Sequence, residues 1–340
     1  MIRAEKSLTG LTKNFEGISI HKNYLNGLDE EEFLSGMEAL AQAFESLYAG
    51  MINEPQAYAM KDADDIKGLV KNMNFLLLAA QKGVLRNGTL EIDGSALAPA
   101  LKEAKVTKPE QYFKILEPQG FVTTGLAKKV EASEKITVDY PDSPHLLTAL
   151  KAMADAVGAF SGINPNQGSI YFEMLDHRVL ANHPATEPKA SMEFILSKMR
   201  SDSRDVVEVF YEFIKPLAKC ELKGGFGHYW TPTFTLKSNK KVILSFKLTL
   251  DNHDVKLNLA NLGKYTEALD GFPEKLIGTI KDGGWGCGGC RAKSDDCAFS
   301  FDLDGQSYRK CRCGSFVFDK PDQNDTELLL KLLKKELEFA

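Results

Sequence analysis

The sequence predicts an α+β protein, in which a helical N-terminal domain is followed by a domain with an antiparallel sheet and a cysteine cluster. Three observations lead to this prediction. The 340 residues suit two domains of roughly 100–200 residues each. Apolar residues recur at helical spacing through much of the first 160 residues, whereas runs rich in β-branched and aromatic residues begin at Trp230. Five of the six cysteines fall between Cys287 and Cys313.

The first half of the chain alternates between helix and strand patterns, with capping signals at several boundaries. Asp29 opens a helix with acidic residues in its first turn, and Ser143-Pro144 opens another. The predicted helices are 29–48, 62–82, 95–104, 107–117 and 144–160, and the predicted strands are 15–21, 89–92, 121–126 and 135–140. From about residue 62 to 140 this is the element order of a winged helix. We therefore expect a winged-helix-like unit within a domain spanning residues 1–160.

A segment rich in Asn, Pro and Gly, Gly162–Gln167, is the best linker candidate, so the second domain is expected to span residues 168–340. After two short extended segments (170–172 and 178–180), the pattern predicts helices and then strands. The helices are 188–199, 203–217, 262–269, 273–280 and 325–338, and the strands are 231–237, 242–250, 255–259, 298–303 and 306–310. Asp304-Gly305 between the last two strands is a strong hairpin signal.

Composition excludes several classes of protein. A net charge of −5 argues against a chain that binds nucleic acid over its whole surface. No run of eighteen apolar residues is present, so we expect no membrane span and no membrane partner. The first residues contain no apolar stretch typical of a secretory signal. We therefore expect a soluble cytoplasmic protein, whose cysteines are thiols or metal ligands rather than disulfides.

The cysteine cluster has the spacing C-x2-C-x6-C-x13-C-x-C, within residues 283–313. In the first pair, two glycines let the backbone curl so that both thiolates meet one ion. Zinc in structural sites takes four ligands at tetrahedral angles, and thiolates suit it. The sequence therefore predicts a structural zinc site built from four of five cysteines. These are Cys287, Cys290, Cys297, Cys311 and Cys313. Cys311 and Cys313 share one face of a strand, so the pattern does not decide between them.

Other interpretations of the cysteine cluster stay open. The thiols of all five residues can be reduced and free of metal, or Cys287 and Cys290 can form a redox pair. An iron–sulfur cluster is less favoured, because its common cysteine spacings differ from this one. If four cysteines bind zinc, no coordination position stays open, and the site is structural rather than catalytic.

The predicted winged-helix-like unit is a poor match to a DNA-binding domain by charge. Its third helix, residues 107–117, holds two lysines and two glutamates, and residues 61–140 together carry twelve basic and eleven acidic residues. A DNA-binding surface needs clustered basic residues for phosphates. We therefore favour packing or protein contact over DNA. DNA binding requires Lys128 and Lys129 to join other lysines on one exposed face.

Catalytic and ligand-binding patterns are weak, and the catalytic residues, if any, are unknown from sequence. Possible reactive residues are Cys220, His228, His177 and His183, none of them in a recognised metal or nucleophile motif. Three aromatic residues are candidates to line a ligand cavity. They are Tyr229, Trp230 and Trp285. Aromatic residues on strands also serve simply as core.

Two resemblances add to this reading. The runs Tyr140-Pro141-Asp142, Leu146-Leu147 and Leu150–Ala154, with the ending from Cys287 to a last acidic amphipathic helix, resemble uncharacterised clostridial-type proteins with a domain-of-unknown-function label. The element order from Trp230 is similar to that of YjbR-like small α+β domains, although the cysteine segment departs from that pattern. Neither resemblance implies an activity or a set of catalytic residues.

These observations predict a non-enzymatic ligand-binding or regulatory protein with a structural zinc site and a small molecule or a protein as partner. One alternative is a winged-helix DNA-binding transcriptional regulator. Another is an enzyme of unknown reaction with a Cys/His cleft. An enzyme should gather titratable residues around one concave pocket, whereas a binding module should show an apolar pocket without them.

Overall fold

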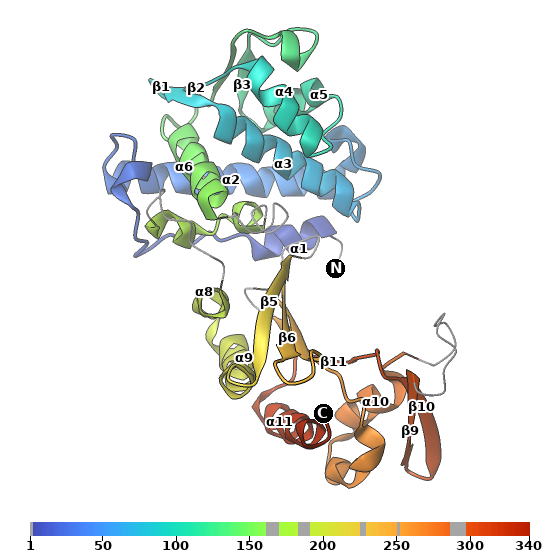
Figure 1. Cartoon of the computed structure of the whole chain (residues 1–340). Helices are drawn as coiled ribbons and strands as arrows, with labels where there is room; N and C mark the ends of the chain where they lie inside the picture. Colours follow the sequence, from blue (N-terminus) through green and yellow to red (C-terminus); the bar gives the residue numbers. More distant parts are fainter. Residues whose placement is uncertain (1–2, 161–169, 183–190, 225–228, 250–251, 286–296) are drawn as a thin grey trace. The chain divides into compact units, whose positions relative to one another are not determined.

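The computed structural model describes residues 3–160, 170–182, 191–224, 229–249, 252–285 and 297–340 (Figure 1). The chain forms two compact units. Unit 1 comprises Met1–Ala190 with Gly224–His228, and unit 2 comprises Ser191–Lys223 with Tyr229–Ala340. Both helices and antiparallel sheets are present, as predicted. Within the described ranges, no helix has the length and apolar character needed to cross a bilayer.

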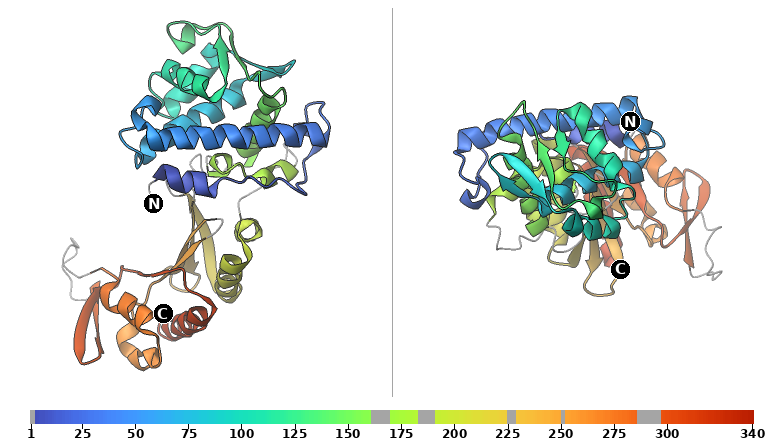
Figure 2. Two further views of the ribbon diagram at one scale, coloured as in Figure 1. Left: turned by 180° about the vertical axis from the view of Figure 1, so that it is seen from behind. Right: turned by 90° about the horizontal axis from the view of Figure 1, so that it is seen from above.

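Unit 1 is built around long helices. They are α1 (Arg3–Gly10), α2 (Glu30–Asn53), α3 (Ile66–Lys82) and α6 (Leu146–Phe160). Asp29 and Glu32 form a capping box at the start of α2, which places acidic side chains at the positive end of the helix. Helix α2 contacts both α1 and α6, and α3 contacts α6 (Figure 2). Their facing apolar side chains form the core of this unit.

A four-stranded antiparallel sheet and two short helices lie between α3 and α6 in sequence. The elements are β1 (Val84–Arg86), β2 (Thr89–Ile92), α4 (Gly94–Glu103), α5 (Pro109–Leu116), β3 (Val122–Thr124), η4 (Val130–Ala132) and β4 (Ile136–Asp139). The strand order is β1-β2-β4-β3. All the helices and strands predicted between residues 62 and 140 are present, and β1 is an additional strand.

Three segments of unit 1 differ from their predicted conformation. Residues 15–21 are not a strand, because Gly17 takes a left-handed conformation (φ +67°) and breaks the extended run. Residues 170–172 are helical, and 178–180 lie in the 3₁₀ helix η5 (His177–Ala181). The rings of Tyr171 and Phe172 pack edge-on against those of Phe160 and Phe44. This packing ties residues 170–182, which the sequence assigned to the second domain, to unit 1.

Unit 2 contains a five-stranded antiparallel sheet with the order β11-β8-β7-β6-β5. Its strands are β5 (Ala218–Gly224), β6 (Trp230–Leu236), β7 (Val242–Leu248), β8 (His253–Leu257) and β11 (Phe316–Asp319). Inward residues such as Phe234, Phe246 and Leu257 are fully buried and alternate with more exposed residues. This alternation is typical of a sheet with one face in a core.

Helices and a separate hairpin complete unit 2. The helices are α8 (Met192–Lys198), α9 (Ser201–Ile214), α10 (Glu274–Asp282) and α11 (Gln323–Glu338), with the 3₁₀ helices η6 (Leu262–Lys264) and η7 (Thr266–Leu269). Helix α11 contacts both α9 and η7. Strands β9 (Ala298–Leu303) and β10 (Gln306–Cys311) form the two-stranded hairpin predicted from Asp304-Gly305.

Candidate functional site

Three of the clustered cysteines lie at the base of the β9–β10 hairpin. Cys297 precedes β9, Cys311 ends β10, and Cys313 lies in the turn that follows. The amide of Cys311 donates a hydrogen bond to the carbonyl of Trp285 (2.8 Å), and the amide of Arg312 donates one to the carbonyl of Cys297 (2.9 Å). These bonds place Trp285 beside Cys311 and Cys297 beside Arg312.

The other two cysteines, Cys287 and Cys290, lie outside the described residues. Within the described ranges, no group of three or more His, Cys, Asp or Glu residues is placed to hold a metal ion. Cys311 is buried and Cys313 is exposed. The backbone around them is closely packed, since a Cβ at Gly314 would lie 2.7 Å from the amide nitrogen of Trp285. The four-cysteine site therefore stays a prediction. Three of its five candidate ligands, Cys297, Cys311 and Cys313, lie at the base of one hairpin.

The three predicted ligand-binding aromatic residues occupy different environments. Trp230 is 1% exposed and faces the core of the sheet, Tyr229 is half-buried, and Trp285 is 67% exposed. The amino group of Lys247 lies 5.1 Å from the ring centroid of Tyr229. A shared aromatic cavity made by these three residues stays a prediction.

The candidate reactive residues do not include an activated nucleophile in the described ranges. Burial, together with the nearby carboxylates of Glu193 and Glu221, raises the pKa of the Cys220 thiol to about 12, so this side chain is protonated at neutral pH. Burial and the neighbouring Arg178 lower the pKa of His177 to about 4. The remaining two candidates, His183 and His228, lie outside the described residues.

Glu336 on α11 accepts hydrogen bonds from two residues of the η6–η7 region and is only 2% exposed. Its carboxylate accepts from the amide nitrogen of Asn261 (3.0 Å), from Asn261 Nδ2 (2.7 Å) and from the hydroxyl of Tyr265 (2.5 Å). Burial raises the pKa of Glu336 above its usual value, while these hydrogen bonds oppose the shift. The arrangement joins the last helix to η6 and η7, which is a structural role.

A second buried carboxylate, Glu173, lies in unit 1. It is 1% exposed, and the guanidinium of Arg3 lies 3.5 Å from it. Burial raises the pKa of Glu173 to about 7, although the nearby Arg3 acts in the opposite direction. The backbone carbonyl of Glu173 accepts a hydrogen bond from the hydroxyl of Tyr48 (2.9 Å). The contact between Arg3 and Glu173 anchors α1 to the core of unit 1.

Lys198, at the end of α8, is the most deeply buried lysine recorded for unit 2, at 4% exposure. Its amino group lies 3.8 Å from the ring centroid of Phe194 and 5.4 Å from that of Trp230. Burial lowers the pKa of Lys198 well below its usual value. Cation–π contacts of this kind offset part of the cost of burying an ammonium group.

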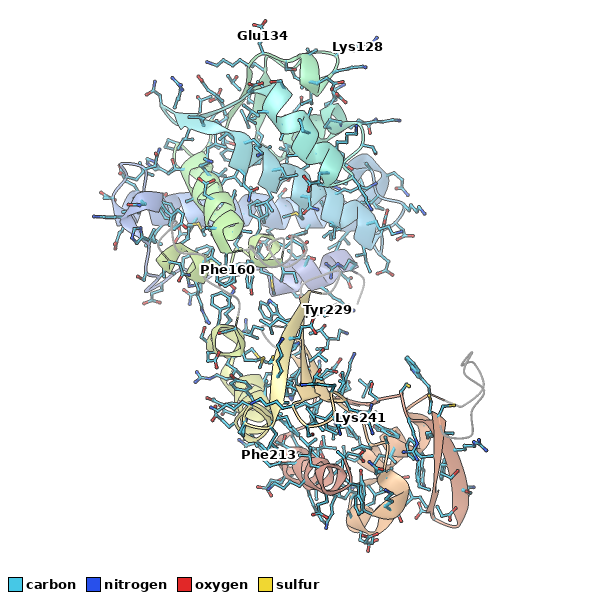
Figure 3. All side chains as sticks on the ribbon, in the orientation of Figure 1. Lys128, Glu134, Phe160, Phe213, Tyr229 and Lys241 are labelled. Atoms are coloured by element: carbon cyan, nitrogen blue, oxygen red, sulfur yellow. The ribbon has the colours of Figure 1, made fainter. Side chains whose placement is uncertain are left out.

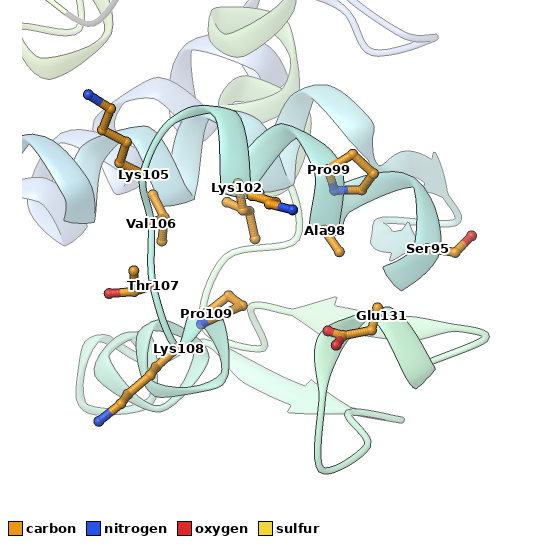
Figure 4. Close-up of a pocket in the computed structure, with 11 residues that line it drawn as sticks. Ser95, Ala98, Pro99, Lys102, Lys105, Val106, Thr107, Lys108, Pro109 and Glu131 are labelled. Carbon is orange, nitrogen blue, oxygen red and sulfur yellow. The ribbon is translucent and has the colours of Figure 1, made fainter.

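A cavity of about 660 Å³ lies in unit 1 between α4, the turn that leads to α5, and η4 (Figure 4). Its walls combine apolar residues, small polar residues, three lysines and one glutamate. The lining residues are Ser95, Ala98, Pro99, Leu101, Lys102, Lys105, Val106, Thr107, Lys108, Pro109 and Glu131. We name this cavity the α4–α5 groove.

Three acidic residues between positions 90 and 110 already make hydrogen bonds or ion pairs. Asp93 caps α4, and Glu110 accepts a hydrogen bond from the amide of Val130 (2.9 Å), which ties α5 to η4. Glu91 pairs with Lys135 and Arg86. By contrast, several exposed lysines have no carboxylate partner among the described residues. They are Lys102, Lys105, Lys108, Lys114 and Lys128. Figure 3 shows Lys128 and Glu134 at the outer end of the loop between β3 and β4.

The groove lysines were not singled out from the sequence, because charge was weighed over residues 61–140, over the third helix and at Lys128 and Lys129, but not over the turn that joins α4 to α5. The spacing Lys102-x2-Lys105-x2-Lys108 at the end of a helix was an available signal. No family model, curated protein or solved structure matches this chain. The resemblances to clostridial-type and YjbR-like proteins therefore stay predictions.

Proposed function

We propose that the chain is a non-enzymatic ligand-binding or regulatory protein that carries a structural zinc ion in its cysteine segment. One observation supports binding over catalysis. Two of the described buried carboxylates, Glu336 and Glu173, stabilise the fold at separate places, whereas the α4–α5 groove is lined by apolar and small polar residues, three lysines and one glutamate. An enzyme's acid–base groups would instead converge on one pocket.

Unit 1 supplies the recognition part of this proposal. Its α3–β2–α4–α5–β3–β4 order, with β4 between β2 and β3 in the sheet, supports the assignment of a winged-helix-like unit. In that reading α5 is the recognition helix, with Gln111 and Lys114 exposed, and the β3–β4 loop is the wing. The hydrogen bond from Val130 to Glu110 would hold this wing against the recognition helix.

Unit 2 supplies the metal site. Cys297 and one of Cys311 and Cys313 would contribute ligands, with Cys287 and Cys290 completing a set of four. Thiolates are soft donors that suit Zn²⁺, and a closed set of four would leave the ion no open position. The hydrogen bonds at Trp285 and Cys297 support this proposal, since they place Trp285 beside Cys311 and Cys297 beside Arg312. The metal would then hold the hairpin to the segment after α10.

A second candidate function, binding of a nucleic acid duplex, is supported by the exposed lysines without described carboxylate partners. Within residues 61–140, Asp93, Glu110 and Glu91 act as a cap, a hydrogen-bond acceptor and an ion-pair partner, so the near-neutral total charge of this segment does not show that five of its exposed lysines lack a described carboxylate partner. Phosphate contacts by Lys114 and Lys128 would bind many sequences with steep salt dependence.

Fluorescence anisotropy with a labelled duplex tests this candidate. Under nucleic acid binding, Lys114→Gln combined with Lys128→Gln weakens binding and lowers its salt dependence, whereas Lys67→Gln, an exposed lysine at the start of α3, leaves both unchanged. Equal effects of all three substitutions, or no binding at low salt, would exclude duplex binding and leave the ligand-binding proposal in place.

A further inference from the structure

The α4–α5 groove combines an apolar floor with a size suited to small molecules. Leu101 and Val106 are 1% and 4% exposed and form the floor, and Ala98 and Pro109 extend it on the two sides. The amide of Val106 donates a hydrogen bond to the carbonyl of Leu101 (2.9 Å), which fixes the turn at the end of α4. A volume of about 660 Å³ falls within the range of small-ligand sites.

Three lysines belong to the lining of this cavity. In Figure 4 Lys102 extends from α4 over the cavity, whereas Lys105 and Lys108 lie on the turn at one end of it with their amino groups pointing outward. All three are exposed, and none has a carboxylate partner among the residues that the structure describes. The one acidic residue of the lining, Glu131, lies 3.9 Å from Lys129, a lysine outside the lining. The groove therefore carries a net positive charge.

The turn holds two of these lysines in an uncommon backbone conformation. Lys105 and Lys108 have φ values of +58° and +55°, in the left-handed region that residues with a Cβ seldom adopt. Such residues cost about 1–3 kcal/mol each and persist where surrounding structure holds them. The backbone of the turn therefore has a defined conformation, which places the Cα atoms of both lysines at the end of the groove.

We propose that the α4–α5 groove binds a small organic anion. The apolar body of the ligand contacts Leu101, Val106 and Ala98, and its phosphate or carboxylate group is bound by Lys102, joined by Lys105 and Lys108 once their exposed side chains rotate toward the cavity. An inorganic anion would leave the apolar floor uncovered, and a nucleic acid backbone would use the lysines without filling the cavity. This assignment rests on the proposed ligand-binding function and names the chemical class of the ligand.

The test uses the full chain and three probes in ¹⁵N–¹H correlation spectra: phenyl phosphate, octanoate and inorganic phosphate. We expect at least one of the two organic anions to shift resonances of α4 and the turn to α5, and to bind more tightly than inorganic phosphate. Ala98→Glu places a carboxylate at the floor and should abolish binding. Ala96→Glu, on the same helix but outside the lining, is the matched control and should bind as the wild type does.

Lys102→Gln should weaken organic anion binding by about fivefold, the upper end for a solvent-exposed ion pair. Lys114→Gln, on α5 and outside the lining, should leave it unchanged. The proposal is overturned if neither organic anion binds, if inorganic phosphate binds as tightly, or if Ala98→Glu has no effect. Duplex binding is measured in the same variants. If it persists in Ala98→Glu and is lost in Lys114→Gln, unit 1 binds a duplex through α5 even when no organic anion binds in the groove.

Discussion

Replacement of Glu336 by alanine removes the acceptor that joins α11 to η6 and η7. Three donors then lose their bond to the carboxylate: the amide nitrogen of Asn261, its Nδ2, which keeps the carbonyl of Phe339 as an acceptor (3.4 Å), and the hydroxyl of Tyr265. An unsatisfied buried donor costs about 1–3 kcal/mol. Asn261 is half-buried and can bind water instead, whereas Tyr265 is 1% exposed and cannot. We therefore expect a loss of about 3 kcal/mol, most of it at Tyr265.

The variant Glu336→Gln removes the charge of the side chain but keeps its size and its hydrogen-bonding groups. Its side-chain carbonyl can still accept from Asn261, and the hydroxyl of Tyr265 can rotate to accept from the new amide. Because burial raises the pKa of Glu336, removal of its charge also relieves a desolvation cost. We therefore expect Glu336→Gln to cost about 1 kcal/mol. Glu338→Ala, at an exposed residue paired with Lys335, is the control and should change stability by less than about 0.5 kcal/mol.

Urea unfolding followed by tryptophan fluorescence measures these differences directly. Both tryptophans, Trp230 and Trp285, belong to unit 2, so this signal follows the unit that contains Glu336. The midpoint should fall in the order wild type, Glu336→Gln, Glu336→Ala, with an unchanged slope. A loss below about 1 kcal/mol for Glu336→Ala would refute the assignment of this network as the contact that holds α11.

Three further predictions concern the buried charges and one close backbone contact. The raised pKa of Glu173, about 7, means that its contribution to the stability of unit 1 is complete below pH 4.5 and is lost as the pH rises to about 7. Unfolding followed by helical circular dichroism should show that the free energy of unfolding of the wild type falls by about 3 kcal/mol at most over this pH range. Glu173→Gln should not show this fall. The lowered pKa of Lys198 has the opposite effect, so the stability of unit 2 should rise with pH towards 10.5, and Lys198→Met should remove this slope in tryptophan-detected unfolding. Gly94→Ala should destabilise unit 1 by more than about 2 kcal/mol in thermal unfolding, because its Cβ would lie 2.0 Å from the carbonyl oxygen of Val130; an unchanged melting temperature would contradict the close contact.

Long, strongly periodic segments and short segments bounded by clear turn or capping signals were predictable from the sequence, whereas short apolar runs without such signals were not. The apolar periodicity and capping residues of α2, α3 and α11 determined their type and approximate limits. Residues 170–172, Ile-Tyr-Phe, are buried on every side in a helical turn, and a short apolar run of this kind has no period that separates helix from strand. Strand β11 was missed because only four residues form it, and its partner β8 lies far away in sequence.

The candidate binding groove shows a different limit of sequence reasoning. The total charge of residues 61–140 is nearly balanced, but charge totals do not show which acidic residues fold into caps and ion pairs. Once Asp93 and Glu110 are engaged by backbone amides, Lys102, Lys105 and Lys108 are left around one cavity. The cysteine cluster, in contrast, was visible from spacing alone, and the hairpin signal at Asp304-Gly305 correctly predicted how β10 returns past Cys297.

Zinc content, measured by elemental mass spectrometry on freshly purified protein together with a free-thiol count, tests the proposed structural metal site most directly. We expect about one zinc ion per chain in the wild type and in Cys220→Ser, a cysteine on β5 outside the cluster. Cys297→Ser should lose the metal and expose reactive thiols, and so should one of the two variants Cys311→Ser and Cys313→Ser. A wild-type chain without metal, whose thiols at Cys287 and Cys290 react freely, would contradict the zinc site and favour redox chemistry at that pair.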